Sequence, residues 1–335
     1  MTQTYQELKA IADDMRANRH DEPPLWAKRP HVVASAPSRH APEKIPVHIY
    51  TSNDADPAHS SSKPKPVHVN WHGSGFVYEN LGQNAEWCHR TAHSLDMIIV
   101  DAQYSKAPEH PYPRALEDCV DVIQWIQSQP WFSPKIGMSI GGWSAGANLT
   151  LAMAAPLTNS CFGLTAEQAA HIKTALSVYP CTDSDPATVD HKLRDGKDVL
   201  PADSVGITFS ATTLRTFFSA YFLGAPADVV NRPETSPLRV SDQQLDSWLQ
   251  TPLLLITCEH DPLEEEGRLF AQRLIKRSKQ TGKGDVELLE LPGVSHRWEI
   301  DTGYNEEEWD TKPGGKQKRH AFDKMEQRLR KTFSL

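Results

Sequence analysis

Short apolar segments alternate with longer segments of helical periodicity through most of the chain. The short segments are largely apolar on both faces, which is typical of strands that are covered on both sides of a sheet. The predicted strands are 32–35, 47–51, 67–71, 97–102, 136–143, 174–179, 253–258 and 286–291. The predicted helices are 84–95, 113–127, 145–155 and 263–278, and a last helix carries Phe322, Met325 and Leu329 on one face. This order predicts an α/β fold with a mostly parallel sheet flanked by helices.

Two parts of the chain interrupt the alternation. Residues 2–18 carry one apolar stripe at helical spacing, made of Tyr5, Leu8, Ile11 and Met15. The second interruption lies between Cys181 and Thr251, where no strand is predicted. An amphipathic helix is expected inside it, because apolar side chains recur there at positions 214, 217, 218, 221 and 222.

Composition and charge exclude several classes of protein. The chain has 35 Lys and Arg against 43 Asp and Glu, a net charge of −8, which argues against nucleic acid as a main partner. No apolar run approaches the ~18 residues that a membrane span needs. The N-terminus lacks the basic start and apolar stretch of a secretory signal. Five scattered Cys form no Cys-x-x-Cys motif, so we expect a reduced, cytoplasmic protein without a disulfide framework or zinc knuckle.

A candidate nucleophile lies between the predicted strand 136–143 and the predicted helix 145–155. Gly142-Trp143-Ser144-Ala145-Gly146 fits the pattern G-x-S-x-G in the strand–turn–helix context that this pattern requires. The turn would push the Ser144 hydroxyl out of the sheet edge, beside the N–H groups and positive dipole of the helix N-terminus. The alternative is an ordinary Gly/Ser turn in which Ser144 only caps the helix.

A second glycine-rich turn follows the predicted strand 67–71 and reads His72-Gly73-Ser74-Gly75-Phe76. Small residues there let backbone N–H groups face the oxyanion that forms when a serine attacks a carbonyl. The expected oxyanion hole uses the N–H groups of Gly73 and Ser74 together with that of Ala145, the residue after the nucleophile. An ordinary glycine-rich turn is the alternative. His72 is expected to brace this loop rather than to act as the base.

A serine nucleophile needs a base that is held by a carboxylate, which completes a catalytic triad. Asp261 follows the predicted strand 253–258, and His296 follows the strand 286–291, in the chain order Ser, acid, His. Asp261 precedes a proline and a helix, so a helix-capping role is the alternative. The neighbouring Glu264–Glu266 are interpreted as charges that match the helix dipole.

Together these motifs resemble the hormone-sensitive-lipase-like group of α/β-hydrolases, the fold-3 carboxylesterases, in the style of fungal members. The group carries HGGGF, Y-R-L-A-P-E-H-P-F-P, GDSAGGN, a D-P-L at the acid and a G-x-x-H near the end. The corresponding stretches here are 72–76, 104–113, 142–148, 261–263 and 293–296. Among the positions that differ, Ser74 replaces a glycine, Trp143 replaces the acidic residue before the nucleophile, and Ala147 replaces a glycine.

The resemblance implies a serine carboxylesterase, a hydrolase of short-to-medium acyl or acetyl esters of small apolar or aromatic compounds. It implies one domain, with a catalytic core at about 30–181 and 236–335 and cap elements at about 1–28 and 182–235. The expected mechanism needs no cofactor and no metal. The expected partner is a small-molecule ester, and a homodimer stays open. Candidate pocket residues, with simple packing as the alternative for the cap aromatics, are Phe76, Val77, Tyr78, Trp143, Phe217 and Tyr221.

Two other functions stay open at this stage. An acyltransferase or lactone-forming cyclase of a biosynthetic pathway would use the same triad, with an alcohol in place of water. A non-catalytic small-molecule receptor could share the fold, although such a receptor is expected to have lost Ser or His. A dehalogenase or epoxide hydrolase is disfavoured, because those enzymes have Asp in place of Ser144.

Overall fold

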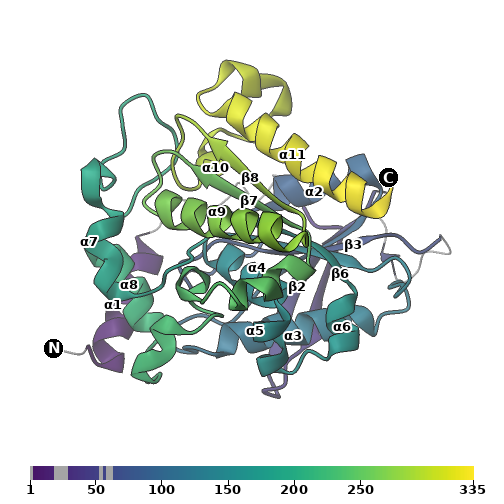
Figure 1. Cartoon of the computed structure of the whole chain (residues 1–335), viewed down its shortest axis with the longest axis horizontal. Coiled ribbons are helices and arrows are strands. Elements are labelled where there is room, and N and C mark those ends of the chain that lie inside the picture. Colours follow the sequence, from purple (N-terminus) through teal and green to yellow (C-terminus); the bar gives the residue numbers. More distant parts are fainter. Residues whose placement is uncertain (1–2, 19–28, 53–55, 58–62) are drawn as a thin grey trace.

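The computed structural model describes residues 3–18, 29–52, 56–57 and 63–335. Within these residues, eight strands form one sheet in the order β1-β2-β4-β3-β5-β6-β7-β8. The sheet lies between helices (Figure 1). β1 and β2 are antiparallel to each other, and β2 is antiparallel to β4, whereas all pairs from β4 to β8 are parallel. The strands are β1 (Val32–Pro37), β2 (Lys44–Tyr50), β3 (Val67–Trp71), β4 (Ile98–Ala102), β5 (Met138–Trp143), β6 (Ile172–Val178), β7 (Leu253–Cys258) and β8 (Val286–Leu291). The predicted mostly parallel sheet is confirmed.

Helices cover both faces of this sheet. α3, α4 and α9 pack on one face, and α2 and α11 pack on the other. The α-helices are α1 (Tyr5–Ala17), α2 (Ala85–Leu95), α3 (Arg114–Gln127), α4 (Ala145–Ala154), α5 (Pro156–Asn159), α6 (Ala166–Ala170), α7 (Val189–Lys192), α8 (Ala211–Tyr221), α9 (Glu264–Thr281), α10 (Trp298–Asp301) and α11 (Gly315–Phe333). Among the residues in the described ranges, no helix combines the length and the apolar character that crossing a membrane requires.

β7 shows why the strands lack a polar face. Leu253 and Leu255 belong to the core on the α9 side, where Phe270 is buried. Leu254, one position along, belongs to the core on the α11 side with Phe322. Because successive side chains point to opposite faces, a strand covered on both sides is largely apolar at successive positions. The apolar character of both faces of these strands in the sequence therefore indicates that helices cover both sides of the sheet.

Element ends agree with the sequence prediction to within a few residues. β5 begins at Met138 rather than at residue 136, because Gly137 has a positive φ of 82° and closes a turn before the strand. The predicted N-terminal helix is α1, whose Leu8 and Ala12 are buried. Residues 1–2 and 19–28 of the expected cap element 1–28 lie outside the described residues.

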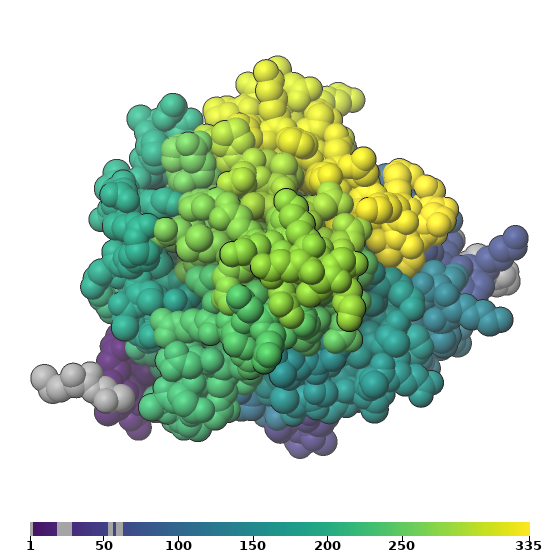
Figure 2. All heavy atoms as spheres, viewed as in Figure 1, coloured from purple at the N-terminus to yellow at the C-terminus, as the bar shows by residue number. Residues whose placement is uncertain are grey.

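The segment 182–235, called the insertion below, lies beside α1 at one flank of the sheet. α1 contacts α8 of the insertion, although the two are separated by almost two hundred residues in sequence. Figure 2 shows the purple atoms of the N-terminal helix next to the teal and green atoms of the insertion. Arg16 on α1 also donates to Val77 O at 3.0 Å and pairs with Glu109 at 2.6 Å, which ties the helix to loops of the sheet.

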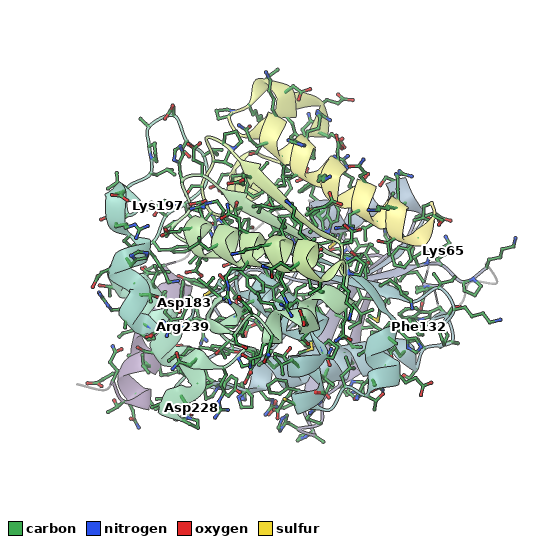
Figure 3. The ribbon with its side chains drawn as sticks, in the orientation of Figure 1. Lys65, Phe132, Asp183, Lys197, Asp228 and Arg239 are labelled. Atoms are coloured by element: carbon green, nitrogen blue, oxygen red, sulfur yellow. The ribbon has the colours of Figure 1, made fainter. Side chains whose placement is uncertain are left out.

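The insertion is anchored to α9 by charged side chains. The first turn of α9 carries Glu264, Glu265 and Glu266, as the dipole interpretation requires. Each also binds the insertion: Glu264 pairs with Lys197, Glu265 with Arg194, and Glu266 with the buried Lys192. Asp183 and Arg239, 2.9 Å apart, form a further pair where the insertion meets the core (Figure 3). The dipole interpretation alone therefore missed the main contacts of these carboxylates.

Candidate active site

Ser144 occupies a strained turn between β5 and α4. Its backbone has φ 54° and ψ −118°, outside the ordinary regions for a residue with a side chain. The flanking glycines make this turn possible. A Cβ on Gly142 would lie 2.3 Å from Gly146 O, and one on Gly146 would lie 2.1 Å from Trp71 O. Glycine is therefore required at both positions, and the serine is placed at the N-terminal end of a buried helix.

Asp261 and His296 meet in the two loops that follow β7 and β8. The parallel pairing of Cys258 with Leu291 places the loops side by side. His296 Nδ1 lies 2.7 Å from Asp261 Oδ2, and Asp261 Oδ1 accepts the N–H of Leu263 at 2.8 Å. Both side chains are removed from solvent, with 0% of Asp261 and 4% of His296 exposed. Asp261 therefore orients the imidazole with one carboxylate oxygen and closes the turn that leads into α9 with the other.

Ser144 and His296 line the same cavity, which has a volume of about 270 Å³. Among the described residues, no hydrogen bond joins the Ser144 hydroxyl to the imidazole. Catalytic hydrogen bonds are often long in a site without substrate, so the absence of this hydrogen bond is compatible with a serine–histidine pair.

Two aromatic rings contact the imidazole of His296. The rings of Tyr179 and Phe209 lie 4.4 and 4.8 Å from it, measured between centroids. The Tyr179 hydroxyl donates to Glu299 Oε1 at 2.6 Å. Glu299 is buried, and this burial raises its pKa to about 7. A buried carboxyl group therefore fixes the ring against which His296 packs.

The loop after β3 lies against the nucleophile. A Cβ on Gly73 would be 3.2 Å from the Ser144 Cβ. The His72 imidazole stacks on Tyr104 at 4.9 Å, and its Nε2 lies 2.7 Å from Gln103 Oε1, so this ring braces the loop. The Tyr104 hydroxyl donates to His72 O at 2.8 Å and lies 2.7 Å from Ser74 Oγ, which therefore donates to it.

The backbone N–H groups beside the nucleophile are oriented by that network. Ser74 Oγ accepts the N–H of Phe76 at 2.9 Å, which closes the turn. The N–H groups of Ser74 and Ala145 have no acceptor within the described part of the chain. Donors without an internal partner beside a serine hydroxyl are what an oxyanion hole requires.

Three of the six candidate pocket residues line cavities next to Ser144. Tyr78 and Phe217 line the cavity of about 270 Å³. Phe76 lines a smaller cavity of about 20 Å³, which is also bounded by Phe217 and by Ser144 itself.

The other three candidates lie in the core and line neither cavity. Trp143 points to the α11 side of the sheet, packs near Phe322 and donates from its indole N–H to Asn70 Oδ1 at 2.8 Å. Tyr221 stacks on Phe76 with the centroids 3.8 Å apart, and Val77 is fully buried. The rings and methyl groups of these three residues complete the packing behind the cavity wall.

Sequence reasoning missed part of the larger cavity. Ile207, Thr208 and Phe209 line it together with Thr213 and Arg297. Residues 205–209 have no periodic pattern, since they run in an irregular segment that is held by the N–H of Ile207 donating to His296 O at 2.7 Å. Arg297 could have been suspected, because it follows the candidate base directly.

A parallel sheet with a serine on a strained turn after β5, and an acid and a histidine after β7 and β8, defines the α/β-hydrolase class. A family profile described as "alpha/beta hydrolase fold" matches residues 68–300, more than half of the chain. The chain therefore belongs to the α/β-hydrolase fold family, and the predicted resemblance to its hormone-sensitive-lipase-like group is confirmed.

Known relatives of the chain are esterases and related enzymes. It is 26% identical over 257 residues to the ethyl acetate hydrolase of Pseudomonas putida, covering 75% of this chain and 70% of the relative. It is 26% identical over 268 residues to tuliposide A-converting enzyme 1 of Tulipa gesneriana, covering 75% of this chain but 60% of that enzyme. A solved structure of a fungal esterase from Rhizomucor miehei matches with a TM-score of 0.71 and 23% identity, over 98% of this chain and 91% of that one.

Proposed function

We propose that the protein is a serine carboxylesterase that hydrolyses acetyl and other short acyl esters of small apolar or aromatic compounds. One observation carries the proposal: a strained serine and a histidine that is hydrogen-bonded to a buried carboxylate line the same cavity. The similarity to a hydrolase named for an acetate ester supports the same class of substrate.

Each group in the site has a role in this mechanism. Ser144 attacks the ester carbonyl, and His296 takes the hydroxyl proton and returns it to the departing alcohol. Asp261 holds the imidazole in the tautomer with the proton on Nδ1 and stabilises its positive charge. The N–H groups of Gly73, Ser74 and Ala145 bind the oxyanion. Water then attacks the acyl-enzyme, and His296 serves as base a second time.

The two cavities beside Ser144 suggest how the ester is oriented. The smaller cavity, about 20 Å³, exceeds by little the ~10–15 Å³ that one water molecule requires. It is apolar, bounded among others by Leu214 and Phe218. We assign it to the acyl group, which it restricts to about the size of acetyl. The larger cavity has aromatic walls at Tyr78, Phe209 and Phe217 and is assigned to the alcohol part.

We further propose that α1 and the insertion act as a cap over the alcohol cavity, with 30–181 and 236–335 as the catalytic core. Thr208, Phe209, Thr213 and Phe217 belong to the insertion and line the cavity that contains Ser144. Because α1 packs on α8, the position of Phe217 depends on the N-terminal helix.

A fluorophosphonate probe and a series of p-nitrophenyl esters test the proposal. Ser144→Ala should abolish both covalent labelling and ester turnover, while the exposed-serine control Ser160→Ala behaves as wild type. Wild type should hydrolyse the acetate fastest, with kcat/KM falling as the acyl chain lengthens. Labelling that persists in Ser144→Ala would overturn the assignment of the nucleophile, and a maximum at octanoate would overturn the assignment of the small cavity.

Acyl transfer or lactone formation by the same triad is a second candidate. The observation that favours it is the similarity to a tulip enzyme named for converting its substrate rather than for hydrolysing it. Product analysis with and without an acceptor alcohol separates the two functions. A transferase yields mainly the new ester when the acceptor is present, whereas a hydrolase yields mainly the free acid.

A further inference from the structure

Three histidines from two parts of the sequence form a cluster at the edge of the molecule. His89 and His93 are one turn apart on α2, so both side chains project from the same helical face. His31 joins them because β1 pairs with β2, and the N–H of His31 donates to Ile49 O at 2.9 Å. The ring centroids of His89 and His93 are 4.3 Å apart, and each lies 5.9 Å from that of His31. One ring nitrogen of each histidine lies within 4.8 Å of the other two.

We propose that His31, His89 and His93 bind a divalent transition-metal ion of the Zn²⁺ type. Neutral imidazole is a preferred ligand of Zn²⁺, Cu²⁺ and Ni²⁺, whereas Mg²⁺ and Ca²⁺ prefer oxygen ligands. Three histidines and one water molecule complete a tetrahedral zinc site.

The geometry is close to that of a bound site. Zn–N distances of about 2.0–2.1 Å imply nitrogens that lie about 3.3 Å apart in a tetrahedron. The nitrogens must therefore approach one another by about 1.5 Å or less from the separation in this structure. His93 is exposed and His89 is half-buried, so rotation of these two side chains toward His31 supplies most of this movement without a shift of the backbone.

Thr51 fixes the ring of His31 from behind. Its N–H donates to His31 Nδ1 at 2.7 Å, and its hydroxyl oxygen lies 3.3 Å from the same nitrogen. The neutral ring therefore carries its single proton on Nε2. Ligation through Nε2 moves that proton to Nδ1, which then donates to the Thr51 hydroxyl oxygen, as metal-bound histidines donate to a second group. The Thr51 N–H loses Nδ1 as its acceptor in this step, so the ring must turn away from that N–H. This change of tautomer is the cost of filling the site.

The cluster lies far from the catalytic chemistry in the topology of the sheet. Thr51 follows β2, whose Tyr50 pairs with Ile99 near the start of β4. Ser144 follows the carboxyl end of β5, and both β4 and β5 run parallel to β3. The two sites therefore lie at opposite ends of the parallel strands. The metal would join α2 to the antiparallel edge of the sheet, and its effect is therefore on stability and not on ester hydrolysis.

Metal titration of chelator-treated protein tests the proposal, with Zn²⁺ in calorimetry and Co²⁺ in visible spectroscopy. Wild type should bind one ion per chain and show a higher melting temperature with Zn²⁺. His89→Gln and His93→Gln should each weaken binding more than ~10-fold and remove the thermal shift. His320→Gln, an exposed histidine on α11, is the matched control and should bind as wild type.

Two results would overturn the metal site. One is binding to both cluster variants with the affinity of wild type, and the other is equal weakening in His320→Gln. Hydrolysis of p-nitrophenyl acetate should be the same with and without one equivalent of Zn²⁺. This readout distinguishes failure of the metal site from failure of the proposed esterase function, because each can fail alone.

Discussion

Asp261→Asn changes one atom of the buried carboxyl group and should inactivate the enzyme without unfolding it. Asp261 Oδ1 accepts the N–H of Leu263 at 2.8 Å, so the oxygen of the introduced amide must take that position. The amide NH₂ then faces His296 Nδ1, where the carboxylate oxygen Oδ2 lay at 2.7 Å. Since the NH₂ can only donate there, Nδ1 must accept and the imidazole proton moves to Nε2. A protonated Nε2 cannot take the proton of Ser144.

The expected loss in kcat is roughly 10³–10⁴-fold, the size of effect that the wrong tautomer produces in serine hydrolases with this triad. This corresponds to about 4–5 kcal/mol in the activation free energy. The side chain keeps both hydrogen bonds: the bond from the Leu263 N–H is unchanged, and the bond with His296 Nδ1 reverses its direction. The free energy of unfolding should therefore change by less than about 1 kcal/mol.

Steady-state kinetics with p-nitrophenyl acetate and urea unfolding measure the two quantities in one set of proteins. Glu264→Gln is the matched control, because Glu264 lies one helical turn from the site and pairs with Lys197 and Arg268. Its kcat should stay within a few fold of wild type. A kcat within tenfold of wild type for Asp261→Asn, or an equal loss in Glu264→Gln, would refute the assignment of the acid.

Three further substitutions test other parts of the structure. Burial raises the pKa of Glu299 from 4.5 to about 7, so its contribution to the unfolding free energy is full below pH 4.5 and is lost as the pH rises through 7. The unfolding free energy of wild type should therefore decline between pH 5 and pH 8, and Glu299→Gln should remove about 2–3 kcal/mol of that decline. An equal decline in the variant, measured by urea unfolding, would contradict this. Leu214→Ala enlarges the small cavity, so kcat/KM for the butanoate ester relative to the acetate ester should rise about fourfold for each methylene group that the cavity accommodates. The control Thr213→Ala, in the larger cavity, should leave this ratio unchanged. Leu8→Ala should lower the unfolding free energy by about 2–4 kcal/mol and reduce kcat/KM for bulky aromatic acetates more than for p-nitrophenyl acetate; equal reduction for both would argue against the cap.

The sequence predicts helices and strands well where the residues of one segment are enough to define its ends. β3, β7 and β8 have the predicted bounds, because each is a short, largely apolar run that turn residues follow. The positions of Ser144, Asp261 and His296 follow from the same rule, since each lies in the loop after a recognisable strand. Their side chains are therefore assigned by chain order rather than by residue type.

The pocket walls depend on packing between distant segments, which periodicity does not report. Trp143 was expected in the pocket because it neighbours Ser144, yet the alternation of side chains along β5 turns it to the opposite face. Phe209 was missed because it lies in an irregular segment beside His296. The cluster of His31 with two histidines of α2 likewise arises only from the pairing of β1 with β2.

The acidic start of α9 makes the proposed cap of this enzyme hard to exchange for the corresponding segment of a relative. Asp261 lies three to five residues before the carboxylates that hold the insertion, and Glu266 also accepts the N–H of Thr182 at 2.7 Å. A transplanted segment without cations at the positions of Lys192 and Lys197 would leave these carboxylates unpaired, one of them buried, beside Asp261, the proposed catalytic acid. Chimeras designed to alter substrate range must therefore carry the first turn of α9 together with the cap that it binds.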